Sequence, residues 1–399
     1  MNDRQTELLR LLKASLFGED AAGLSCDPAA LLSEAQRHGV LLLAVNDADP
    51  SLFPDDLRQE LSHSVKRALE RDLRIGNAHV MLSSLLESEG IGHTLIKGLA
   101  SAVWYPAPEL RQTGDVDFYV APEDVERTQG FLVSRGFEPL KLSHGVHRVF
   151  KKDGCRFELH FKVSGLPSGE AGKVCEGLFG DMIERSQIKD TPFGAARMPS
   201  DLHHGLVLLL HTAHHLTNSG VGLRHLCDWA VFASGLSGDS GFPEEFTQAL
   251  KKTGLLGFAL CLDDICVRYL GAPGTLPVTE DKELSDTLLD DMLSGGNLGQ
   301  GDGSLSKQAY FITSGKKERS PLSRFFKVMT DMVYQKWPAA RRFKPLVPVG
   351  WGWFALKYLI KAATGKRPAL DLRKTFKKAG ERTELYDRLR LFEAEKEII

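Results

Sequence analysis

The sequence predicts an α/β (α+β) fold, in which one helical region precedes a small sheet along the chain and another follows it. Residues 1–90 carry apolar side chains at helical spacing, and helical spacing returns from residue 201 onward. Between them, residues 93–163 contain short apolar runs and a strong two-residue turn signal. This order of patterns is typical of a sheet domain covered by helices.

Residues 1–90 are expected to form helices that pack on the sheet and contain no cluster of chemical groups. The first helix, TELLRLLKASLF, ends at Gly18, and a second opens at Asp27-Pro28 with proline in its first turn. A third, longer pattern runs from Asp55 to Ser88. One side of that helix is predicted to carry its apolar residues: Leu57, Leu61, Val65, Leu69, Leu73, Ala78, Met81 and Leu85.

The stretch from His93 to Val120, HTLIKGLASAVWYPAPELRQTGDVDFYV, is expected to hold the functional site. A short apolar run turns sharply at Lys97-Gly98 into a helical pattern, and a strand that carries Asp115 and Asp117 follows. Glycine lets the backbone approach a ligand closely, and the N-terminus of a helix offers N–H groups to a phosphate. Lys97, Gly98 and Leu99 are therefore candidate phosphate-binding residues.

Asp115 and Asp117 are candidate metal ligands. Residues two apart in a strand point to the same side, so both carboxylates lie on one face, about 6–7 Å apart along the chain. Like charges at this separation repel each other unless a cation lies between them. Mg²⁺ prefers oxygen ligands of this type and completes its shell with substrate phosphates. A solvated strand edge is the alternative interpretation.

The segment after these acids predicts a helix, which begins near Pro122 and ends at Gly136, and then a hairpin. Asp153-Gly154 is the turn signal of the hairpin. In its second strand Phe157, Leu159 and Phe161 face one way, whereas Arg156, Glu158, His160 and Lys162 face the other. Residues 164–198 are expected to be loop-rich with one helix.

From Asp201 onward, histidines and charged residues recur in a helical pattern. His211 and His215 are one turn apart, and Arg224, His225 and Asp228, which follow after a glycine turn, are expected to lie within reach of them. A zinc site at the two histidines is one interpretation, but no third ligand has a firm spacing; a buried pair that lines the cleft is favoured. Arg224 is either a ligand contact or the i,i+4 ion-pair partner of Asp228.

The C-terminal region is rich in basic and aromatic residues. The Gly/Ser-rich segment LSGGNLGQGDGSLSKQ is expected to be a linker. From residue 316 onward basic residues outnumber acidic ones, and within 337–367 they flank Trp337, Trp351, Trp353, Phe354 and Tyr358. This combination suits an anionic membrane surface or a nucleic-acid backbone, and a solvated helical face is the alternative.

Composition limits the other classes of protein. The net charge is −2, and the six cysteines are scattered, which disfavours a disulfide framework or a zinc ribbon. We find neither a secretory apolar core at the start nor about 18 consecutive apolar residues, so we expect a cytoplasmic protein, with peripheral membrane contact as an option. Four regions are predicted: 1–90, 91–198, 199–290 and 291–399.

The sequence motif IKGLASA…YP…LRQTGDVDFYV resembles the polymerase-β-like nucleotidyltransferase superfamily, and in particular a bacterial group described as uncharacterised nucleotidyltransferases. The resemblance is strongest from His93 to Val163. It implies a mixed sheet of the palm type and transfer of a nucleoside monophosphate from a nucleoside triphosphate, such as ATP, to an acceptor hydroxyl, with release of pyrophosphate. Many members have Gly-Gly or Gly-Ser where this chain has Lys97-Gly98-Leu99.

The resemblance also implies roles for named residues. Asp115, Asp117 and Glu158 would hold two Mg²⁺ ions, with Mn²⁺ as a substitute, and Lys97, Gly98, Leu99, Arg111 and Arg224 would contact the nucleotide. His160, His211, His215 and Asp228 would line the acceptor side of the cleft. The acceptor would be a small molecule, a protein side chain or a tRNA end. The alternative is a catalytically silent nucleotide-binding or scaffold protein of a biosynthetic or envelope system.

Overall fold

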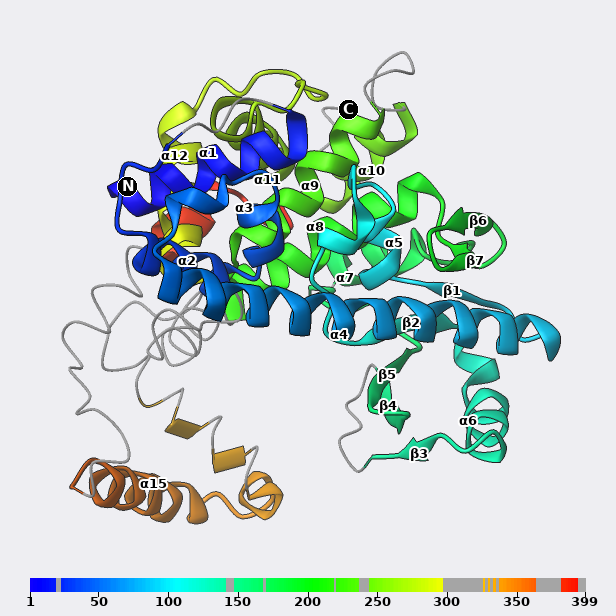
Figure 1. The fold of residues 1–399 in the computed structure, drawn as a ribbon. Coiled ribbons are helices and arrows are strands. Elements are labelled where there is room, and N and C mark those ends of the chain that lie inside the picture. The colour runs from blue at the N-terminus through cyan, green and yellow to red at the C-terminus, as the bar shows by residue number, and fades with distance from the viewer. Residues whose placement is uncertain are drawn as a thin grey trace.

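The computed structural model describes the chain over the following ranges: 1–18, 23–140, 147–167, 170–218, 220–236, 244–296, 326, 329–330, 333–334, 337–363 and 382–393. Within them the protein has a mixed α+β fold, in which many helices accompany a five-stranded mixed sheet (Figure 1). The predicted fold class is confirmed.

Short helical elements open the chain, and capping residues mark the ends of the first two. They are α1 (Asp3–Phe17), α2 (Pro28–His38), α3 (Leu41–Asn46) and the 3₁₀ turn η1 (Pro50–Leu52). Gly18 ends α1 in the left-handed conformation, and the Asp27 side chain accepts a hydrogen bond from the Ala30 N–H at the start of α2. Both helices therefore match the sequence prediction.

Helix α4 (Asp55–Ser88) is the longest element, and it crosses the width of the molecule in Figure 1. Its bounds match the prediction, and the predicted apolar side is correct in part, since Ala78 is buried and Leu57, Leu61, Met81 and Leu85 pack against the cores. Ile75, Leu82 and Leu86 are buried, whereas Leu73 is 47% exposed. A spacing of four residues advances about 40° around a helix at each step, so part of the predicted stripe, at Leu73, turns away from the core.

The sheet has the strand order β1-β2-β5-β4-β3. Its strands are β1 (His93–Leu95), β2 (Val116–Val120), β3 (Glu138–Pro139), β4 (His147–Lys152) and β5 (Cys155–His160). The β2–β5 pair is parallel and the other pairs are antiparallel. The connections contain α5 (Gly98–Ala102), η2 (Pro108–Leu110), η3 (Pro122–Asp124) and α6 (Val125–Ser134).

The β4–β5 hairpin orients the residues of β5 as predicted. Asp153 and Gly154 both have positive φ and connect Lys152 to its cross-strand partner Cys155. Phe157 and Leu159 are fully buried in a core that also contains Leu82 and Leu86 of α4. Because side chains alternate along a strand, Glu158 and His160 lie on the opposite face of the sheet.

Residues 164–198 contain more structure than predicted. Helix α7 (Glu170–Gly177) is followed by a two-stranded ribbon, β6 (Gln187–Thr191) and β7 (Gly194–Met198). None of the five residues of β6 is buried, and Ile188 is 57% exposed. The strand therefore lacks the alternation of apolar and polar residues by which a half-buried strand is recognised.

A second core joins helices from both ends of the chain. The later helices are α8 (Asp201–Asn218), α9 (Leu223–Leu236), α10 (Glu244–Thr253), α11 (Leu256–Ile265), the π-helical turn η4 (Cys266–Leu270), α12 (Lys282–Gly295) and a helix over 382–388. Leu8 of α1 and Leu31 of α2 share one cluster with Leu209 and Trp229. The expectation that the whole N-terminal region covers the sheet was thus wrong for α1–α3.

The 3₁₀ helix η6 (Pro338–Arg341) and helix α15 (Leu346–Ala363) belong to a small cluster of their own, around Val333, Ala340 and Val347. Figure 1 draws α15 apart from the other labelled helices. Among the described residues, no helix combines the length and apolar character needed to cross a membrane. Most of the predicted Gly/Ser-rich linker, 297–308, lies outside the described residues.

Candidate active site

The parallel pairing of β2 and β5 brings the predicted acids together. Asp117 is the cross-strand partner of Glu158, and Asp115 lies directly before β2. Asp117 is 3% exposed and Glu158 is 9% exposed, whereas Asp115 is half-buried. All three line one pocket of about 520 Å³. The family resemblance implied this juxtaposition, and the alternation of side chains in each strand gave the side to which the acids point.

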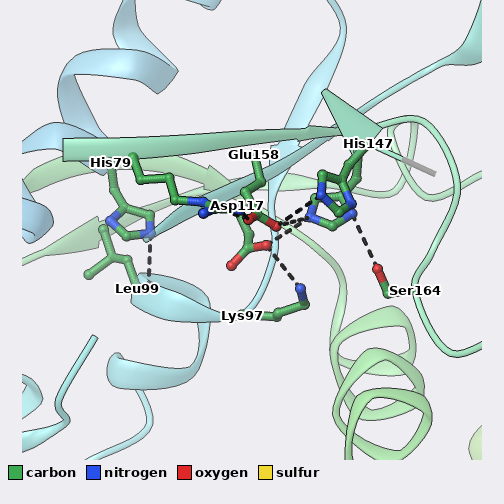
Figure 2. Close-up of polar contacts among 9 residues, drawn as sticks. His79, Lys97, Leu99, Asp117, His147, Glu158 and Ser164 are labelled. Atoms are coloured by element: carbon green, nitrogen blue, oxygen red, sulfur yellow. Dashed lines mark hydrogen bonds and ion pairs between the residues drawn. The ribbon is translucent and has the colours of Figure 1, made fainter. Parts of the chain in front are cut away.

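Basic side chains surround the acids (Figure 2). Asp117 Oδ1 accepts hydrogen bonds from Lys97 Nζ at 2.9 Å and pairs with His160 Nε2 at 2.7 Å. Glu158 accepts from Arg156 Nη2 at 2.6 Å, and its other oxygen lies 3.8 Å from His147 Nε2. Asp117 and Glu158 therefore each have a cationic partner, and His160 lies next to both of them.

The pKa values of Asp115 and Asp117 are shifted in opposite directions. The negative charge of Asp117, together with burial and the charge of Glu158, raises the pKa of Asp115 to about 7. Burial would raise the pKa of Asp117 as well, but Lys97 and His160 hold it far below its usual range. Burial likewise disfavours the Lys97 ammonium, yet Asp117 raises the pKa of Lys97 overall. The site thus holds more negative charge than its own cations neutralise.

The turn at Lys97-Gly98 has the sharp geometry that the sequence predicts. Lys97 has φ 56° and ψ −142°, and Gly98 has φ 34°. A Cβ on Gly98 would lie 2.5 Å from Nε2 of His79, so only glycine fits here. His79 Nδ1 bonds to the Ile75 carbonyl, which leaves Nε2 to accept the Leu99 N–H at 3.5 Å (Figure 2).

This arrangement changes the expectation for Leu99. Its side chain is buried and does not line the pocket, and its N–H points to His79 instead of to a phosphate. Helix α5 is also only five residues long, so its dipole is small. Lys97 and Gly98, by contrast, both line the pocket.

Arg111 and Asp228 form a buried ion pair that the sequence did not predict. Arg111 Nε and Nη2 donate to the two oxygens of Asp228 at 2.8 and 2.7 Å, and the Tyr105 hydroxyl donates to the same carboxylate at 2.7 Å. The i,i+4 pairing of Arg224 with Asp228 was therefore wrong. Arg111 still reaches the pocket wall, but Asp228 does not line the pocket.

Arg224 lines the pocket from the start of α9. Its Nη1 donates to the Gln112 carbonyl at 3.1 Å. Burial and the nearby charge of Arg111 lower the pKa of Arg224. An anion bound in the pocket would meet this guanidinium.

His211, His215 and His225 form a cluster of three imidazole rings. The rings of His211 and His215 on α8 lie 4.4 Å apart, and the ring of His225 on α9 lies 5.5 and 5.3 Å from them. One nitrogen from each of the three lies within 4.8 Å of the others. His147, Glu158 and His160 form a second group of this kind among the described residues.

Several pocket residues were missed by the sequence interpretation. They are Gln36, Gly39, Arg71, Gln112, Thr113, Gly114, Ser164 and His214. Gln36 and Arg71 come from the N-terminal helices, which were expected to carry no chemical groups. A single polar residue on an amphipathic helix has no signal in one sequence, because a solvated helix face has the same pattern.

Comparison with known proteins identifies the family. A family model described as "Uncharacterised nucleotidyltransferase" matches residues 25–271. The match covers more than half of the chain and includes α2–α11, the sheet and every residue of the pocket. A search of curated proteins found no match.

Proposed function

Because the chain belongs to this family of uncharacterised nucleotidyltransferases, we propose that it transfers a nucleoside monophosphate from a nucleoside triphosphate to an acceptor hydroxyl in a Mg²⁺-dependent reaction. In this reaction the acceptor oxygen attacks the α-phosphorus, the bond to the β-phosphate oxygen breaks, and pyrophosphate leaves. The supporting observation is that the carboxylates of Asp115, Asp117 and Glu158 face the same pocket as the cationic groups of Lys97 and Arg224.

The donor set fits magnesium. Asp115, Asp117 and Glu158 supply hard carboxylate oxygens, and the raised pKa of Asp115 reports negative charge that a cation would compensate. These three residues would hold two Mg²⁺ ions, and Mn²⁺ would substitute for them. Bound there, the ions would neutralise charge on the attacking and the leaving oxygens.

The cations of the pocket would act on the phosphates. Lys97 has a flexible side chain, so its ammonium is able to move from Asp117 to a phosphate oxygen when a metal ion replaces it. Arg224 offers a planar guanidinium that suits phosphate geometry. Arg111 is held by both oxygens of Asp228, so it contributes positive field to the pocket instead of a mobile contact.

The proton of the acceptor hydroxyl requires a base. Glu158 lies on the strand next to Asp117. Burial raises the pKa of Glu158, but His160, His147 and Arg156 together lower it overall. We assign the proton acceptance to Glu158 and the orientation of Asp117 to His160. Most of the rate enhancement would come from positioning and charge neutralisation.

The test is release of pyrophosphate from each of the four nucleoside triphosphates, measured with and without Mg²⁺ in the presence of a cell extract as acceptor source. We expect release that depends on Mg²⁺ and falls by at least about 100-fold in Asp117→Ala and in Glu158→Gln. Glu138→Gln, on the exposed strand β3 of the same sheet, is the matched control and should retain activity. Labelled nucleotide would then identify the modified acceptor, whether small molecule, protein or tRNA.

One observation favours a second candidate, a silent nucleotide-binding scaffold. Lys97 already neutralises Asp117, where an active enzyme would bind its metal. This candidate predicts that nucleotide binding is retained in Asp117→Ala and that no pyrophosphate is released by either protein. Equilibrium binding of a labelled triphosphate, compared with pyrophosphate release on the same samples, separates the two candidates.

For the C-terminal region we propose peripheral contact with an anionic membrane surface through 337–367, of which 364–367 lie outside the described residues. Helix α15 exposes Val349, Trp353 and Leu356, at 60%, 52% and 52%. Arg341 and Arg342 lie just before it. Co-sedimentation with anionic but not neutral vesicles, reduced in Trp353→Ala, would support this contact; binding to nucleic acid alone would contradict it.

A further inference from the structure

Three histidines converge at the wall of the pocket without being used by the proposed transfer reaction. His211 and His215 are one turn apart on α8, and His225 lies in the first turn of α9. The glycine turn between the helices brings α9 back beside α8. As a result, three imidazoles that are not contiguous in sequence face one another.

The distances between the three imidazole rings are similar to those between histidines that share one metal ion. With a metal–nitrogen bond of about 2.1 Å, the ring centre lies about 3.2 Å from the ion, and two tetrahedral ligands have ring centres about 5.2 Å apart. The observed ring separations are 4.4, 5.5 and 5.3 Å. The closest nitrogens lie within 4.8 Å of one another, compared with about 3.4 Å in a tetrahedral site, so small ring rotations would complete the ligand set.

The polar atoms of the cluster provide a second observation. Nδ1 of His225 and Nδ1 of His211 are buried, and neither has a hydrogen-bond partner among the described residues. His225 is only 4% exposed, so water does not readily replace such a partner. Buried polar atoms are usually satisfied by hydrogen bonds or by ligation, and a metal ion would satisfy a nitrogen on each ring.

We propose that His211, His215 and His225 bind a divalent transition metal of the Zn²⁺ type. Imidazole nitrogens select zinc, nickel or copper, whereas the carboxylates of Asp115, Asp117 and Glu158 select magnesium. The two sites would therefore hold different ions. Three protein ligands also leave a fourth coordination position for an exogenous ligand.

The fourth position faces the pocket, because His211 and His215 both line it. Lys97 and Arg224 line the same pocket, and their positive charges favour an anionic ligand there. The exogenous ligand class is therefore an anionic oxygen, such as a phosphate or carboxylate group of a substrate. Inorganic phosphate is a suitable probe for this position.

The experiment uses the full chain, purified without a histidine tag, stripped with a chelator and titrated with Co²⁺. We expect one equivalent to bind with the intense visible absorption of tetrahedral cobalt, to be displaced by Zn²⁺, and to shift on addition of phosphate. X-ray absorption of the zinc-loaded wild-type protein should show three imidazole ligands. Absence of stoichiometric binding, or ligation dominated by oxygen, would overturn the proposal.

Matched variants locate the ion. His225→Ala and His215→Ala should each weaken Co²⁺ binding by at least about 100-fold, since even loss of an outer-shell partner weakens metal affinity 10–100-fold. Glu158→Gln should leave the cobalt spectrum unchanged. If Glu158→Gln loses Co²⁺ binding while His215→Ala and His225→Ala retain it, the ion lies at His147, Glu158 and His160, and the proposal is overturned. Pyrophosphate release is not part of this test, so the two proposals can fail independently.

Discussion

Lys97 combines an unfavourable backbone conformation with a buried charge. Its φ of 56° with ψ of −142° lies in a region that side-chain-bearing residues rarely adopt, and its Nζ bonds Asp117 at 2.9 Å. Strained residues of this kind persist where the surrounding structure fixes them, often at functional sites. The conformation places the ammonium next to Asp117.

Replacing Lys97 with glycine or with alanine separates the strain from the charge. Both variants lose the ammonium, but only Lys97→Gly also relieves the backbone. We expect Lys97→Gly to be more stable than Lys97→Ala by about 1–3 kcal/mol, measured by urea unfolding. Both should raise KM for the nucleotide if the ammonium contacts a phosphate.

The control is Lys66, which is exposed in the middle of α4. There glycine should be less stable than alanine by about 1 kcal/mol, because glycine is a poor helix former. If the Lys97 variants follow the order of the Lys66 variants, the interpretation of Lys97 as strained is wrong.

The sequence predicted the individual acids of the site better than their partners. Asp115 and Asp117 follow from the two-residue repeat of strands, which a single sequence contains, and Glu158 follows from the family resemblance. The partner of Arg111 does not, because Asp228 is 117 residues away and only the fold brings it near. His225 was expected within reach of His211 and His215, but its ring distances to them depend on how α9 packs beside α8, which the sequence does not contain.

At the scale of elements, the buried ion pair connects the segment after η2 to α9. Arg111 is 6% exposed and Asp228 is 5% exposed, and Tyr105 donates a third hydrogen bond to the carboxylate. This pair fixes the segment between η2 and β2 relative to α9, the helix that carries Arg224. The Asp228 carboxylate, together with the hydrogen bond from Arg224 to the Gln112 carbonyl, thus connects the two walls of the pocket.

Removing one partner of this pair should be strongly destabilising. We expect Asp228→Ala to lower the free energy of unfolding by about 3–5 kcal/mol, because the Arg111 charge is left buried and unpaired. The double variant Arg111→Leu/Asp228→Leu should lie much closer to wild type, since no charge remains buried. Urea unfolding of the single and double variants measures both effects.

Asp286 provides the exposed comparison, as its carboxylate is 48% exposed and pairs with Arg268. Asp286→Ala should change the free energy of unfolding by less than about 1 kcal/mol. Equal losses in Asp228→Ala and Asp286→Ala would mean that the buried pair does not hold the elements together.

Elements with a strong local signal were predicted correctly, and those stabilised by distant contacts were not. The ends of α1 and α2 and the Asp153-Gly154 turn follow from capping and turn chemistry. The β6–β7 ribbon lacks buried residues on β6. Its connecting residue Phe193 instead packs close to Gly76 of α4, where an added Cβ would lie 2.7 Å from the ring.

For the whole molecule, two cores meet at the pocket. The first half of α4 packs with the helical core through Leu57 and Leu61, and its second half packs under the sheet through Leu82 and Leu86. The pocket takes residues from the helical side, including Gln36 and Arg224, as well as from the sheet side. A change in the relative position of the two cores would therefore reshape the site.

Buried neutral histidines should make the whole fold sensitive to acid. Burial lowers the pKa of His79 to about 4 and that of His204 to about 3, both below the ordinary value of 6.5. Below pH 6.5 the unfolded chain binds protons that the folded chain does not. Stability is therefore complete above this pH and decreases as the pH falls toward the folded-state values.

His204 allows the effect to be measured outside the pocket. It stacks on Trp104 at 6.1 Å and contacts Phe232 at 5.2 Å. Relative to wild type, His204→Leu should gain about 2 kcal/mol in free energy of unfolding between pH 7.5 and pH 5, because leucine takes up no proton in the unfolded state. Urea unfolding at both pH values measures the difference in free energy of unfolding between His204→Leu and wild type. A loss of packing in the variant is the same at both pH values, so it does not affect the change in this difference.

Phe232→Leu is the matched control, since it disturbs the same aromatic cluster without a titrating group. Its difference from wild type should be the same at pH 7.5 and pH 5. If the His204→Leu difference is equally flat, His204 binds its proton in the folded state as readily as in the unfolded chain. Acid sensitivity would then have to arise at the other buried histidines, among them His79.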